Sequence, residues 1–165
     1  MPDILKLEEF QLTDLLVRWH EEGNEGREES ERLIADGECG LSYEVFRQKE
    51  NPCLFALEMR FQFTPGEGRP KAGYEIDATI EGFFTFPEGM PEDNMQTLIR
   101  LNGLTILYGI LRGEVASVTG LFQGGRFVLP AVYMPDIIES IESQKPKPPK
   151  KRPARASKKR SRKKS

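Results

Sequence analysis

Few side chains in this sequence are of the types that do chemistry, and they stand far apart. The single histidine, His20, lies between Trp19 and Glu21, and the two cysteines are Cys39 and Cys53. Two isolated cysteines do not form a metal-spaced cluster, and no acid/base pair or phosphate-binding glycine motif accompanies them. We therefore expect no enzyme, no metal and no cofactor, and we interpret His20 as an ordinary surface residue.

The N-terminal residues, the cysteines and the longest apolar run indicate the cellular compartment. The opening M-P-D-I-L-K lacks the basic-then-apolar pattern of a signal peptide, and unclustered thiols are typical of a reducing compartment. The most apolar run, residues 98–111, is interrupted by Arg100 and Asn102 and is shorter than the ~20 residues that a membrane span needs. We expect a cytoplasmic protein without a transmembrane segment.

The chain has 165 residues, and its net charge of −2 conceals an uneven distribution. Twelve of the 24 basic residues lie in 145–165 with no acidic residue, which leaves residues 1–144 with 12 bases against 26 acids, a charge of −14. We expect one folded domain over 1–144 and a disordered basic tail over 145–165.

The tail has two interpretations. Its bases are spaced to bind nucleic acid, anionic lipid or an acidic protein surface, or they fold back onto the acidic domain. The basic residues that we expect to contact a polyanion are Lys150, Lys151, Arg152, Lys158, Lys159 and Arg160.

Three segments alternate between apolar and polar residues with a period of two, around 43–45, 54–63 and 74–81. Such alternation is typical of antiparallel strands with one packed face and one wet face. The wet face would be acidic, and it either meets solvent or binds a basic partner through Glu58, Glu75 and Asp77. Residues 4–19 fit a strand, with Leu15, Val17 and Trp19 on one face, and fit an amphipathic helix equally well.

Pro91 suits the first turn of a long helix that ends near Gly120. That helix would be roughly 45 Å long, against a diameter of about 37 Å for a compact domain of this size. One sheet would then be too short to cover it, so either the helix breaks or its surplus apolar surface packs against another copy, which we favour. The predicted oligomer interface is Leu104, Leu107, Leu111, Val115 and Val118.

This order of elements and three short motifs resemble the SecB-like protein-export chaperone family. The helix contains I-L-R-G-E-V-A-S-V with Arg112 and Glu114, and L-P-A-V-Y-M follows at 129–134. At the start, F-Q-L-T-D-L-L-V-R-W is similar to the family's first strand, with Phe10 and Asp14 at matching places. The basic tail departs from the family, whose tail is acidic or short.

The resemblance implies an α+β fold: a four-stranded antiparallel sheet packed on one face by a long helix and a short final helix. It implies a homo-oligomer, dimer or tetramer, that binds unfolded or exported client polypeptides without ATP, and a SecA-type motor as a partner. The expected client groove lies between the crossover connection and the last helix. Its residues, which could instead simply close the core, are Trp19, Leu33, Ile34, Phe122, Phe127, Tyr133, Met134, Ile137 and Ile138.

Three functional hypotheses follow. The first is an ATP-independent holding chaperone. The second is a dedicated chaperone or adaptor of one partner, of the toxin–antitoxin type. The third is a nucleic-acid-associated protein that acts through its tail.

Overall fold

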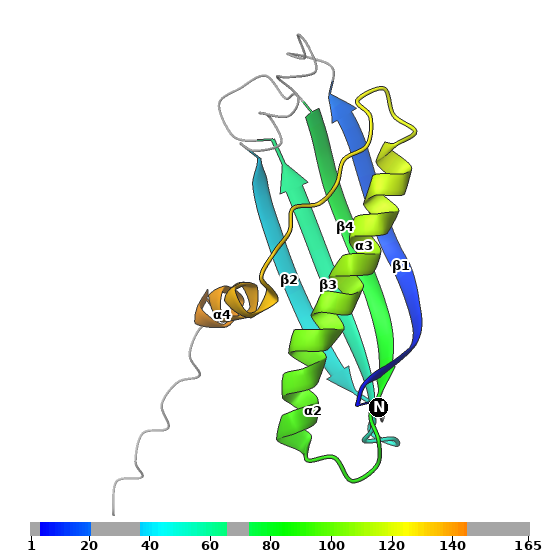
Figure 1. The fold of residues 1–165 in the computed structure, drawn as a ribbon, viewed down its shortest axis with the longest axis vertical. Helices are drawn as coiled ribbons and strands as arrows, with labels where there is room; N and C mark the ends of the chain where they lie inside the picture. Colours follow the sequence, from blue (N-terminus) through cyan, green and yellow to red (C-terminus); the bar gives the residue numbers. More distant parts are fainter. Residues whose placement is uncertain (1–3, 21–36, 66–72, 145–165) are drawn as a thin grey trace, which may run out of the picture.

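A computed structural model describes residues 4–20, 37–65 and 73–144 and shows one antiparallel sheet in the order β1-β4-β3-β2 (Figure 1). The three segments with period-two alternation all form strands, as predicted. The face that carries their apolar residues is the packed one, as the alternating burial along β3 and β4 shows. The strands are β1 (Lys6–His20), β2 (Glu38–Arg47), β3 (Leu54–Thr64) and β4 (Gly73–Thr85).

The first segment is a strand and not a helix. β1 pairs with β4 along its whole length, with Leu15 opposite Ala78 and Val17 opposite Ile76. Its register shifts twice, between Leu7 and Glu9 and between Leu12 and Asp14. The local pattern allowed both structures, and pairing with a long apolar strand decides between them.

The predicted long helix is present and runs without a break. It consists of α2 (Glu92–Leu98), a π-helical turn η1 (Ile99–Gly103) and α3 (Leu104–Thr119), roughly 42 Å in all at ~1.5 Å per residue. No helix in the described part of the chain has the length and apolar character that crossing a membrane requires.

One sheet does cover this helix, so the prediction that it could not was wrong. β1 has 15 residues and β4 has 13, about 50 and 43 Å at ~3.3 Å per residue, because the domain is elongated and not spherical. The helix lies along the length of the sheet (Figure 1). The oligomer interface is corrected accordingly: Leu104, Leu107, Leu111 and Val115 have no exposed surface and pack in the chain's own core, while Val118 is half-buried.

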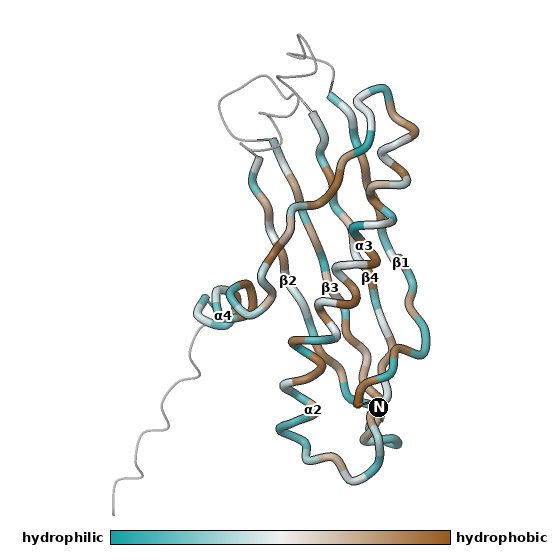
Figure 2. Tube along the Cα trace, in the orientation of Figure 1, coloured by the Kyte–Doolittle hydropathy of each residue, from teal (hydrophilic) through white to brown (hydrophobic). Residues whose placement is uncertain are grey.

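After the helix, residues 120–124 form a turn, and the chain then crosses the packed face of the sheet toward β2 as an extended linker, residues 125–133. The linker is apolar where it crosses (Figure 2), and Phe127 and Leu129 are fully buried there. It ends in α4 (Met134–Gln144), the predicted short final helix, which lies beside β2. These elements confirm the predicted α+β fold class.

Candidate functional site

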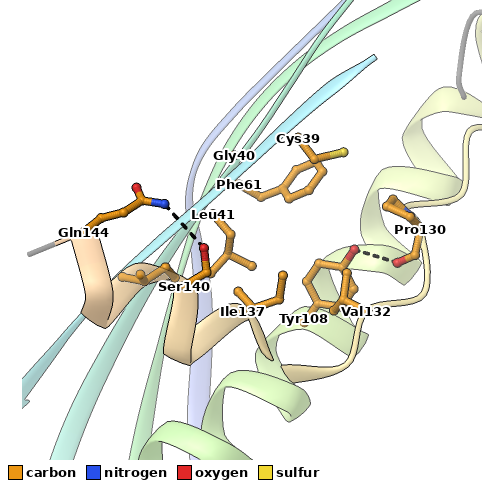
Figure 3. A pocket seen from close by; sticks show the side chains of 11 residues that line it. Cys39, Gly40, Leu41, Phe61, Tyr108, Pro130, Val132, Ile137, Ser140 and Gln144 are labelled. Carbon is orange, nitrogen blue, oxygen red and sulfur yellow. Dashed lines mark hydrogen bonds between the residues drawn. The ribbon is translucent and has the colours of Figure 1, made fainter. Parts of the chain in front are cut away.

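An apolar pocket of about 250 Å³ lies where the linker passes over β2 to reach α4 (Figure 3). Leu41 of β2 and Phe61 of β3 form its floor, and α4 closes one side with Ile137 and Ile141. Tyr108 of α3 forms the other side. The full lining is Cys39, Gly40, Leu41, Phe61, Tyr108, Pro130, Val132, Ile137, Ser140, Ile141 and Gln144.

The polar groups around this pocket are largely engaged with one another. The Tyr108 hydroxyl donates a 2.7 Å hydrogen bond to the Pro130 carbonyl, and Gln144 Nε2 donates to Ser140 Oγ at 3.4 Å. Burial raises the pKa of Tyr108 to about 12 and raises the pKa of the Cys39 thiol. The pocket therefore presents neutral groups at physiological pH.

Such a lining binds apolar groups and does little else. The volume is below the ~300 Å³ at which typical small-molecule sites begin, so it suits one or two side chains of a polypeptide. In the described ranges, no group of three or more His, Cys, Asp or Glu side chains is placed to hold a metal ion. The geometry is that of a binding surface for apolar side chains.

Three of the predicted client-binding residues meet elsewhere, in an aromatic cluster around Tyr74. Trp19 lies 4.9 Å from the Tyr74 ring, Phe127 lies 5.6 Å from it and Phe122 lies 6.1 Å from it, between ring centroids. Phe127 is only 1% exposed, and the Tyr74 hydroxyl donates to the Thr119 and Gly125 carbonyls. This cluster holds the turn after the long helix against the sheet.

The remaining predicted client residues are dispersed. Ile137 lines the pocket, Met134 and Ile138 are buried in the core, and Tyr133 is 69% exposed. Leu33 and Ile34 lie outside the described residues, as does the whole basic tail with its predicted polyanion contacts. The client-binding assignment thus remains a prediction, and of its members that the structure describes, Ile137 alone lines the pocket.

Sequence reasoning missed most of the pocket lining. Leu41 precedes the short alternating run that marked β2, so its place on the packed face had no local signal. Tyr108 sits in a helix that is apolar on several sides, and only the linker packing shows which wall it forms. Ile141 had a signal, because it shares the apolar side of α4 with Ile137 and Ile138.

The three residues of the predicted acidic partner face do share one face of the sheet, the one opposite the long helix. Arg60 donates to Asp77 at 2.6 and 2.9 Å and holds the pKa of that carboxyl below its usual range. Arg18 lies 3.6 Å from Glu75, which also contacts His20 at 2.9 Å. No basic contact is recorded for Glu58 within the described part of the chain.

The sheet, long helix, crossing linker and short last helix define a SecB-like fold, as the resemblance implied. One solved structure with this fold is a SecB-like chaperone from Mycobacterium tuberculosis in complex with a ChAD peptide from the HigA1 antitoxin. It is 13% identical with a TM-score of 0.56, over 78% of this chain and 91% of that one.

A second structure, a protein of unknown function from Streptococcus agalactiae, is 12% identical with a TM-score of 0.42, over 77% of this chain and 97% of that one. No family model and no curated protein matches the sequence. Of these comparisons, the Mycobacterium tuberculosis structure is the one that supports the fold.

Proposed function

We propose that this protein is a holding chaperone, which binds apolar segments of unfolded client polypeptides without ATP and catalyses no reaction. The observation that carries the proposal is the pocket with Leu41, Phe61 and Ile141 in its lining, which is apolar, open at the surface and too small for a large cofactor. The SecB-like fold supports it. Apolar surface that is not committed to one shape tolerates many client sequences.

The test is suppression of aggregation of a chemically denatured model protein by the full chain, with and without ATP. We expect suppression at stoichiometric excess in both conditions, and its absence would overturn the proposal. Ile141→Glu places a charge in the pocket and should abolish the effect. Val128→Glu is the matched control, because Val128 is 46% exposed and does not line the pocket.

A dedicated chaperone of one partner is the second candidate, and the small pocket favours it. Room for one or two side chains suits a single anchoring motif better than a wide range of clients. Capture of one dominant partner by the wild-type chain, lost with Ile141→Glu and coupled to weak general holding activity, would select this candidate over the first.

We also propose a homo-oligomer, now through the outward face of α3. Adding a Cβ at Gly109 or Gly113 would meet nothing within 4 Å, so this face is open to close approach, and Ile106 and Ile110 beside it are half-buried. Light scattering of the full chain should report a dimer or tetramer. Ile110→Glu should reduce the mass to that of a monomer, whereas a monomeric wild type would contradict the proposal.

The free thiols Cys39 and Cys53 support a reducing, cytoplasmic location. A SecA-type motor and nucleic acid remain predicted partners. Nucleic-acid binding through the tail should fall steeply with salt, with a log–log slope of about −0.7 to −0.9 per phosphate contacted.

A further inference from the structure

One face of the sheet is left uncovered by the described elements. The long helix and the linker occupy one face, and α4 lies at the β2 edge (Figure 1). The opposite face, called here the outer face, is formed by the alternate residues of each strand, such as Glu44 of β2, Glu58 of β3 and Glu81 of β4. This outer face is separate from the client pocket, which opens on the other side of β2.

A row of carboxylates crosses this outer face. Glu44 stands directly opposite Glu58, and Glu58 stands directly opposite Glu81. Like charges at directly opposed positions destabilise a sheet unless a cation lies between or above them. Among the residues that the structure describes, Glu81 accepts a hydrogen bond only from the Gln11 amide, at 2.7 Å, while Arg18 and Arg60 of the same face pair with Glu75 and Asp77. The row therefore attracts a positively charged occupant.

The chain contains such an occupant, and it follows α4 at the β2 edge of the sheet. Residues 145–165 hold 12 basic and no acidic side chains and follow directly from Gln144, the end of α4. That end is fixed to β2, because Tyr43 donates to Glu142 at 3.3 Å and Arg100 donates to the same carboxylate at 2.9 Å. Glu44, at one end of the row, is the residue after Tyr43 on this edge strand, and its side chain points to the opposite face of the sheet, so the tail reaches the row around the β2 edge.

The tail is long enough to span the whole carboxylate row. Twenty-one residues extend up to about 70 Å, whereas three neighbouring strands span only about 10 Å. We infer that the basic tail, residues 145–165, binds across the outer face of its own sheet on the carboxylate row Glu44, Glu58 and Glu81. The tail and the row then cover each other, so a polyanion that binds the tail removes it from the outer face and exposes that face.

The first test is zero-length carbodiimide coupling of the full chain, followed by mass spectrometry. We expect tail lysines joined to Glu44, Glu58 and Glu81, with a yield that falls as NaCl rises, because exposed charge pairs are screened. A mixture of isotope-labelled and unlabelled chains separates coupling within one chain from coupling between chains. Tail coupling that is only between chains, or that is spread evenly over all exposed carboxylates, would overturn the inference.

The second test uses the competition between the tail's two partners. The triple variant loses the carboxylate row, which competes with heparin for the tail, so its affinity for heparin should rise about fivefold. The three substitutions are Glu44→Gln, Glu58→Gln and Glu81→Gln. The matched control removes three exposed carboxylates elsewhere, Glu88, Glu114 and Glu139, for an equal change in net charge. Equal gains in the two triple variants would overturn the inference, since net charge alone would then explain both.

Discussion

The Tyr108 hydroxyl lies 2.7 Å from the Pro130 carbonyl and joins the long helix to the linker that crosses the sheet. Both residues line the pocket, so this single hydrogen bond sets the distance between two of its walls. The ring also packs edge-on against Phe61, 6.2 Å away between centroids. Tyr108 therefore connects the fold to the candidate site.

Tyr108→Phe keeps the ring and removes the hydroxyl, which leaves the Pro130 carbonyl without this donor. We expect a loss of about 0.5 to 1.5 kcal/mol in the free energy of unfolding, the net worth of a typical hydrogen bond, because Pro130 is exposed and this bond is only partly buried. Denaturant titration measures it. A variant as stable as the wild type would mean that solvent replaces the hydroxyl as the donor.

The pH dependence of stability should change in the same variant. The pKa of Tyr108 is raised to about 12 in the folded chain, from an ordinary value near 10, chiefly by burial. The folded state holds the phenolic proton more tightly, so this contribution is complete below pH 10 and is lost as the pH rises through about 12. Stability profiles of the wild type and Tyr108→Phe should converge over that range, and parallel profiles would contradict the assignment.

The two cysteines provide an internal control for occupancy of the pocket. Cys39 lines it, whereas Cys53 precedes β3 away from it. Cys39 is exposed to reagent, and partial desolvation raises the pKa of its thiol, so its alkylation by iodoacetamide should accelerate as the pH rises and the thiolate forms. A bound client should slow the labelling of Cys39 and leave Cys53 unchanged. Equal protection of both thiols would place the client elsewhere.

Replacing each of two glycines with alanine should change the stability of the fold in opposite directions. At Gly124 an added Cβ would lie 2.3 Å from the Trp19 ring, so Gly124→Ala should destabilise the fold by about 1 to 3 kcal/mol. At Gly109 it would meet open space in a helix, so Gly109→Ala should stabilise the monomer by roughly 0.5 to 1 kcal/mol. Thermal unfolding of both variants compares them, and a stable Gly124→Ala would contradict the packing of the aromatic cluster.

The sequence predicted the sheet because Phe55, Leu57 and Met59 recur with a period of two over one long strand. It left β1 open because its pattern fits two periods, and the choice depends on β4, a partner far along the chain. The assignment of Leu104 and Leu107 to an interface between copies is wrong. A spherical domain of this size would be shorter than the helix, whereas the long strands build a sheet that matches the length of the helix. The pocket was mostly missed, since Tyr108 and Val132 become neighbours only when the linker folds back.

The π-helical turn between Ile99 and Leu104 has a consequence for comparing this chain with others. Successive residues of an α-helix advance by about 100°, so these two would point about 140° apart in a regular helix. Both are nevertheless fully buried, because the wider turn absorbs one extra residue and brings the two apolar stripes into phase. A similar protein with a regular helix would need one residue fewer here. An ungapped alignment would match one half of the helix correctly and shift the other half by one residue. Such a shift compares buried positions with exposed ones and lowers the apparent identity of two chains that share the fold.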